Sequence, residues 1–171
     1  EKTHFGIRTL SLDPKHGLRI NGKVTKLRGA CVHHDNGVIG SAAIDRAEER
    51  RVQILKGAGF NAVRSAHYPI SKSFLDACDR IGMLVMDEVS DMWTRCKNDS
   101  DFAHYFPHVW QEVCERFVGK DFNHPSVILY SIGNEIPETG SANGAEIGRK
   151  IAEKLRSLDS TRYILNSINT M

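Results

Sequence analysis

Two polar pairs follow apolar runs that are typical of buried strands. Asn134 and Glu135 end the run that begins at Val127, and Asp87 and Glu88 end another apolar run. A carboxyl group can give or take a proton, and an amide can hydrogen-bond a hydroxyl. In a parallel α/β barrel the catalytic groups lie at the C-terminal ends of the strands. The two pairs therefore favour a barrel enzyme with carboxylate chemistry, with a helix cap or an arginine partner as the alternative reading of Glu135.

The elements that would position these pairs alternate between strand and helix from about residue 24 onward. Strands are predicted at residues 27–32, 61–66, 83–88, 127–132 and 163–166, with helical periodicity between them. Consecutive βα periods predict a parallel sheet with helical crossovers. No G-x-G-x-x-G or Walker pattern follows a strand, which disfavours a nucleotide-binding fold.

Helix-terminus signals support this series. Asp45 followed by Glu48 predicts a capping box at the start of the first helix. Ser71 is the predicted N-cap of the second helix and Gly82 its stop signal. Pro107 suits the first turn of the third helix.

The first residues follow a different pattern. Residues Phe5–Leu10 alternate like a strand. Turn signals at Asp13-Pro14 and Asn21-Gly22 flank a short apolar stretch, which predicts a β-hairpin.

Composition excludes several classes of protein. The chain has 171 residues, a net charge of +2, 40% hydrophobic residues and 26% charged residues. The charge gives no basic patch for nucleic acid, and no apolar run reaches the roughly 18 residues of a membrane span. The cysteines at 31, 78, 96 and 114 show no C-x-x-C spacing, so free thiols are expected.

Residues Glu1–His4 lack both an apolar signal region and an initiator Met, so the natural N-terminus is expected elsewhere. Free thiols fit a reducing compartment without proving one. Localisation stays open, with cytoplasm or periplasm as the choices for a bacterial protein.

Several residue strings together resemble the catalytic barrel of glycoside hydrolase family 2, whose members include β-galactosidases, β-glucuronidases and β-mannosidases. The strings are LRGACVHHD at 27–35, NAVRSAHYP at 61–69, DE at 87–88, NHPSV at 123–127 and GNE at 133–135. The resemblance covers about residues 5–171.

This resemblance implies an α/β fold, a TIM (β/α)8 barrel, present here as a partial barrel of about five parallel strands and four helices after a short β-hairpin. Residues 1–23 would end a preceding β-sandwich domain and form the hairpin, and residues 24–171 would be the N-terminal part of the barrel. The family's nucleophilic glutamate lies near a later strand, so the chain is expected to be a fragment that lacks it.

The resemblance also assigns roles. A retaining glycosidase needs two carboxyls about 5–5.5 Å apart. Glu135 matches the acid/base residue, and Asn134 would donate to the sugar 2-hydroxyl. By resemblance His33 and His67 contact sugar hydroxyls, although core or loop histidines satisfied by backbone are the alternative.

Asp91 and Trp93 lie in the long loop 89–106 and look like residues of a β-galactosidase-like branch. Asp91 would bind hydroxyls and Trp93 would stack on a sugar face, with a loop aspartate and a packing tryptophan as the alternative. Arg64 would pair with buried carboxylates, either to set the nucleophile's ionisation or as a structural ion pair. Asp87 and Glu88 point opposite ways on a strand, so both receive a support role.

No cofactor and no catalytic metal are predicted. His33 and His34 are adjacent and face opposite sides of a strand, so they cannot share an ion. The stretch Val89–Trp93 lacks the Glu-x-His pattern with which some family members hold magnesium.

The leading prediction is a retaining β-glycosidase that acts on β-galactosides. A β-glucuronidase, a carbohydrate-binding half-barrel and, less favoured, a metal-dependent barrel hydrolase are the alternatives. The expected partner is a β-linked saccharide, with no nucleic acid and no membrane. Self-association is expected as well, because edge strands of a partial barrel leave backbone groups unpaired.

Overall fold

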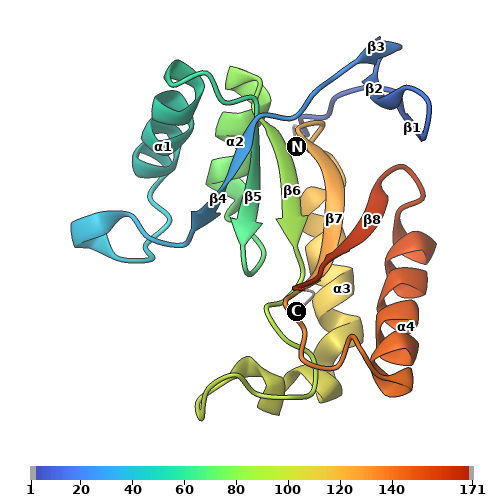
Figure 1. The fold of residues 1–171 in the computed structure, drawn as a ribbon. Coiled ribbons are helices and arrows are strands. Elements are labelled where there is room, and N and C mark those ends of the chain that lie inside the picture. The colour runs from blue at the N-terminus through green and yellow to red at the C-terminus, as the bar shows by residue number, and fades with distance from the viewer. Residues whose placement is uncertain (1–2, 170–171) are drawn as a thin grey trace.

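A parallel sheet of five strands forms the centre of the chain, seen in a computed structural model that describes residues 3–169 (Figure 1). The sheet has the order β4-β5-β6-β7-β8, and every neighbouring pair is parallel. Its strands are β4 (Gly29–His33), β5 (Ala62–Ala66), β6 (Leu84–Glu88), β7 (Val127–Asn134) and β8 (Tyr163–Ser167). The predicted partial barrel is confirmed, because each strand follows the previous one through a helical crossover.

The crossovers contain four helices and two short 3-10 turns. They are α1 (Asp45–Gly57), α2 (Lys72–Ile81), α3 (Phe106–Asp121) and α4 (Ala142–Leu158), with η1 (Gly37–Ile39) before α1 and η2 (Phe102–His104) before α3. Figure 1 shows α1 and α2 beside β4 and β5, and α4 beside β8. None of the helices among residues 3–169 is long and apolar enough to cross a membrane.

Most helix ends follow the predicted signals. Ser71 accepts a hydrogen bond from the Phe74 backbone N–H, and Gly82 closes α2 in the left-handed region at φ 80°. Pro107 lies in the first turn of α3.

The predicted capping box at the start of α1 is wrong. The helix is preceded by Ile44, and no side chain caps it. Glu48 is only 3% exposed. Its carboxylate accepts from Asn36 Nδ2 at 2.6 Å and pairs with Arg51 at 3.3 Å. Burying a carboxylate without such partners costs more free energy than leaving the helix without a side-chain cap.

The N-terminal segment forms a small antiparallel sheet. Its strands are β1 (Leu10–Asp13), β2 (Gly17–Ile20) and β3 (Lys23–Val24), in that order. The predicted hairpin is confirmed, but the strand expected from Phe5 begins only at Leu10. Residues before Leu10 are fixed differently: the Arg8 guanidinium donates to the backbone carbonyl of Val127, at the start of β7.

The main core lies between the sheet and its helices. Phe74, Leu75, Phe117, Tyr130 and Leu155 are fully buried there. Burying each such side chain contributes roughly 1.5–3 kcal/mol. All four cysteines are free, as predicted.

The other face of the sheet carries a largely apolar hollow of about 230 Å³. Its lining includes Leu27, Ala30, Val63, Val85 and Leu129. Within the described residues, this hollow lies on the face that a closed barrel turns toward its interior.

Strand β7 departs from regular pairing near its end. Ser131 pairs with Leu165 and Asn134 pairs with Ser167, so the register shifts by one residue between the two pairs. Such a shift is a β-bulge, which re-aims the side chains that follow it. Residues three apart face opposite sides of a regular strand, but here Ser131 and Asn134 both reach the same polar cluster.

Candidate active site

Strand β7 brings two polar residues to the C-terminal edge of the sheet. Every residue from Val127 to Asn134 is buried, whereas Glu135 is exposed. Glu135 adopts φ 45°, and its backbone N–H donates to the Ser167 carbonyl at 2.7 Å. Within residues 3–169 its carboxyl group forms no hydrogen bond or ion pair. The chain therefore presents an uncommitted carboxyl directly after a buried strand.

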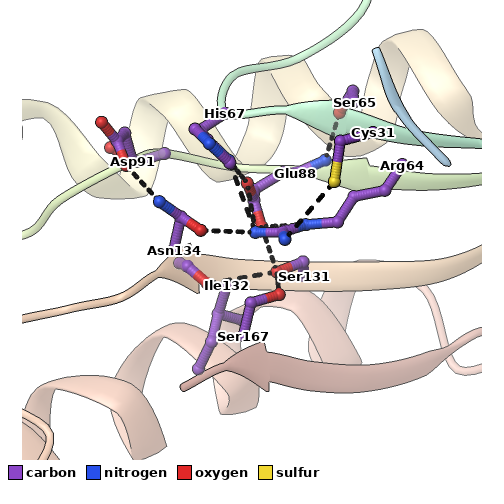
Figure 2. A network of polar contacts seen from close by, with 12 residues as sticks. Cys31, Arg64, Ser65, His67, Glu88, Asp91, Ser131, Ile132, Asn134 and Ser167 are labelled. Carbon is purple, nitrogen blue, oxygen red and sulfur yellow. Dashed lines mark hydrogen bonds and ion pairs between the residues drawn. The ribbon is translucent and has the colours of Figure 1, made fainter. Parts of the chain in front are cut away.

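The Asn134 side chain is held at both ends (Figure 2). Its Oδ1 accepts from Arg64 Nη2 at 2.8 Å, and its Nδ2 donates to Asp91 Oδ1 at 2.8 Å. Arginine can only donate and a carboxylate can only accept, so these partners fix the orientation of the amide. The second Nδ2 hydrogen has no partner among the described residues and could serve a ligand hydroxyl.

Glu88 is the buried centre of this cluster. Its side chain is 0% exposed and pairs with Arg64 Nη2 at 2.8 Å. Ser131 Oγ donates to the same carboxylate at 2.5 Å, and His67 Nδ1 lies 2.8 Å from its other oxygen. A wholly buried carboxylate is tolerated because these donors compensate its lost hydration.

The two histidines predicted to contact a sugar lie side by side. His33 and His67 have ring centroids 5.3 Å apart in an edge-to-face arrangement. Because Glu88 can only accept, His67 Nδ1 carries the hydrogen of their shared bond and Nε2 is left for another partner. His33, on the neighbouring strand, is exposed.

Asp91, from the loop after β6, completes the cluster. Besides Asn134, it binds Lys97, whose Nζ lies 2.7 Å from Asp91 Oδ1. The same Nζ donates to the Asn134 carbonyl at 2.7 Å. Asp91 is thus held by two donors, Asn134 Nδ2 and Lys97 Nζ.

Asp87 points away from this cluster, as the alternation predicts. It accepts from Ser65 Oγ at 2.5 Å and from the Ile70 N–H at 3.0 Å, and it pairs with Lys120 at 2.8 Å. Asp121 joins the same buried group, where burial and then the charge of Asp87 hold the pKa of Asp121 well above its usual 3.8. Asp87 therefore supports the sheet from its helix-covered face.

The predicted stacking role of Trp93 is not compatible with its position. Trp93 is 1% exposed, and its Nε1 donates to the Ile132 carbonyl at 2.8 Å. A Cβ on Gly148 would lie 3.0 Å from the indole ring, so this glycine leaves the space that the ring fills. A ring so enclosed has no face for a sugar, and Trp93 joins the loop to the core.

A separate group of metal-ligand types lies just before β7, at the opposite end of the strand from Glu135. Ligand atoms of Asp76, Asp79 and His124 lie within 4.8 Å of one another. Asp79 already accepts from His124 Nδ1 at 2.6 Å and from the Ser126 N–H at 3.0 Å. Burial alone would raise the pKa of Asp79, but these hydrogen bonds outweigh it and lower the value. The group anchors the chain as it enters β7.

Sequence reasoning missed three members of the cluster. The sequence does mark Ser131, because a serine within an otherwise apolar strand indicates a polar partner. Lys97 had no such signal, since it lies in an irregular loop. Ser167 had none either: it contributes its backbone carbonyl to the Glu135 N–H and a hydroxyl 3.4 Å from Ser131 Oγ.

A family model described as the TIM barrel domain of glycosyl hydrolases family 2 matches residues 14–169. The chain belongs to glycosyl hydrolase family 2. The β-galactosidase BoGH2A of Bacteroides ovatus is 44% identical over 164 residues, which are 96% of this chain and 18% of that protein. A putative β-glucuronidase of Formosa agariphila is 37% identical over 133 residues, 78% of this chain and 13% of that protein.

A solved structure of a family 2 member from Bacteroides cellulosilyticus superimposes with a TM-score of 0.95 at 46% identity, covering 98% of this chain and 22% of that one. The chain thus spans less than a quarter of the length of these glycosyl hydrolase family 2 proteins.

In this family 2 barrel segment, the acidic groups of the cluster differ in availability. Glu88 is buried and paired with Arg64, and Asp91 is paired with Lys97. Glu135 alone is both exposed and uncommitted among these three. The arrangement can supply one proton donor or acceptor beside a fixed amide.

Proposed function

We propose that this chain is part of a retaining β-glycosidase in which Glu135 is the acid/base residue. The observation that carries the proposal is the uncommitted Glu135 carboxyl next to the doubly held Asn134 amide. Glu135 would protonate the leaving oxygen and later deprotonate water. Asn134 Nδ2 would donate to the sugar 2-hydroxyl, a bond that strengthens in the transition state.

The remaining residues of the cluster would bind and orient the sugar. His33, His67 and Asp91 each offer a polar group at the same edge of the sheet. Arg64 would hold Asn134 in place, and Glu88 would hold His67. This division of labour follows the general pattern in which groups around the site are fixed by an outer set of hydrogen bonds.

A retaining mechanism also needs a nucleophilic carboxylate about 5–5.5 Å from the acid/base. Glu88 and Asp91 are committed to cations. We therefore assign the nucleophile to a part of the barrel outside residues 3–169. This chain alone would then not turn over glycosides, because covalent catalysis needs both groups.

A β-galactoside is the favoured substrate, because the 44% identical relative is named a β-galactosidase. A β-glucuronide is the second candidate, supported by the 37% identical relative named a putative β-glucuronidase. The assignment of residues 1–23 to a preceding domain is part of the same proposal.

The test uses the complete enzyme, meaning a polypeptide that carries these residues together with the rest of the barrel. Glu135→Gln should lower kcat/KM by roughly 100- to 10,000-fold for substrates with poor leaving groups, which need a proton. Aryl glycosides with activated leaving groups should lose far less.

Glu146→Gln is the matched control, because Glu146 is an exposed glutamate on α4 that pairs with Lys150. It should leave both substrate classes unchanged. Equal losses for both leaving-group classes in Glu135→Gln would refute the acid/base assignment.

A further inference from the structure

The peptide bond between Asn134 and Glu135 is held from both sides. Its carbonyl accepts from Lys97 Nζ at 2.7 Å, and its N–H donates to the Ser167 carbonyl at 2.7 Å. Glu135 follows at φ 45°, in the left-handed region that residues with a Cβ avoid. Such a conformation persists only where the surroundings fix it.

We propose that Lys97 is the positioning residue for this peptide and so for the Glu135 carboxyl. Its ammonium would hold the Asn134 carbonyl on one side and Asp91 on the other, at 2.7 Å each. One cation would then orient Asn134, through Asp91, and Glu135, through the carbonyl that precedes it. This inference rests on the proposed function of Glu135 and Asn134.

Hydrogen bonds fix the loop that carries Lys97, so the position of the ammonium is set before a ligand binds. The Lys97 N–H donates to Asp101 Oδ2 at 2.7 Å. Just before it, the N–H groups of Thr94 and Arg95 donate to Glu138 Oε1 at 3.0 and 2.8 Å. Glu138 is 4% exposed and follows Glu135 on the same loop. The Glu138 contacts join the loops after β6 and β7 next to the lysine contact, and Asp101 fixes the Lys97 backbone within its own loop.

Charge gives Lys97 a role that a neutral side chain could not fill. Asp91 Oδ1 receives both Lys97 Nζ and Asn134 Nδ2. Without the ammonium, the Asp91 carboxylate loses its only ion-pair partner among the described residues and is free to turn toward water. The Asn134 amide would then lose a fixed acceptor as well, and the carbonyl before Glu135 would lose its donor.

The experiment compares Lys97→Met with Lys97→Arg in the complete enzyme. Methionine keeps an unbranched chain and removes the ammonium, whereas arginine keeps a donor cation. Lys154→Met is the control, because Lys154 pairs with Glu115 and its side chain is 25% exposed, against 24% for Lys97.

Lys97→Met should lower kcat/KM by roughly 100-fold with poor leaving groups, the scale of a misplaced catalytic group. The loss with activated aryl glycosides should be less than about tenfold, because they need little acid assistance. Lys97→Arg should recover part of the loss, and Lys154→Met should match the parent for both substrates. The melting temperatures of the two methionine variants should agree.

Several outcomes would overturn the proposal. They are unchanged kinetics in Lys97→Met, a loss that is equal for both leaving-group classes, and a Lys97→Arg variant with no leaving-group dependence and no recovery. If Lys97→Met does not fold, Lys97→Arg decides alone, since a displaced cation should still give a leaving-group-dependent loss.

Glu135→Gln in the same series separates this proposal from the function on which it rests. If Glu135→Gln shows leaving-group dependence and the Lys97 variants do not, only the positioning role fails. If Glu135→Gln shows none, the acid/base assignment fails.

Discussion

Removal of Arg64 should destabilise the chain through the carboxylate that it leaves behind. Arg64 donates to Glu88 through Nη2 at 2.8 Å and Nε at 3.2 Å, and to Asn134 Oδ1 at 2.8 Å. In Arg64→Met, the donors left to the 0% exposed Glu88 side chain among residues 3–169 are His67 and Ser131. The variant therefore buries a charge without its main counter-ion.

The size of the effect follows from this burial. Breaking a buried ion pair by removing one partner costs roughly 3–5 kcal/mol. The Arg64 side chain is 20% exposed and His67 can donate in its place, so the lower end, about 3 kcal/mol, is expected. With a urea dependence of about 2 kcal/mol/M, the unfolding midpoint should fall by about 1.5 M.

The assay is equilibrium urea unfolding of the 171-residue chain, followed by tryptophan fluorescence. Arg64→Lys keeps a cation near Glu88 but loses the planar fork, so it should lie between the parent and Arg64→Met. The double variant Arg64→Met with Glu88→Met removes both charges and should be more stable than Arg64→Met alone. A double variant that is no more stable than the single one would refute the reasoning, because the unpaired Glu88 charge would not be the cause.

Two further predictions concern the chain as a whole. Because the pKa of Asp121 is raised, the folded state keeps a proton that the unfolded state releases above pH about 4. The contribution of this group to the free energy of unfolding should therefore fall as pH rises. In urea titrations, the stability of Asp121→Asn relative to the parent should increase from pH 4 to pH 7. A difference between the two that stays constant across that range would contradict this. The chain should also self-associate through its hollow apolar face, as measured by light scattering at rising concentration. Leu27→Asp, at a 40% exposed lining residue, should reduce this association, whereas Val38→Asp, at a fully exposed site in η1, should not; a monomeric parent chain would exclude it.

The strands were predictable because each of them contains a continuous apolar run, which is typical of a parallel sheet. Val127–Gly133 and Met83–Met86 are such runs, and β7 and β6 lie there within two residues of the predicted bounds. Cap residues with a unique backbone requirement, such as Gly82, were equally readable. Both features are determined by residues close together in the sequence, so they can be predicted from the sequence alone.

Features that depend on contacts distant in the sequence were not readable. The side chain of Glu48 turned to Asn36 and Arg51 instead of capping its helix. Trp93 faces the core, although a loop tryptophan could as well face a ligand. Lys97 acquires its partners only when the loops after β6 and β7 meet. The strand-end residues and Asp91 of the candidate site were therefore readable from the sequence, whereas Lys97, which holds Asp91, was not.

The bulge near the end of β7 determines which face of the sheet carries the Asn134 side chain. Ser131 and Asn134 reach the same cluster only because β7 has one more residue than β8 between the paired positions. If β7 continued as a regular strand from Ser131 to Asn134, with all its residues present, the Asn134 amide would point toward the helices, although the apolar content of the strand would be the same. The backbone irregularity, and not the apolar pattern of the strand, therefore decides on which face of the sheet the Asn134 amide lies.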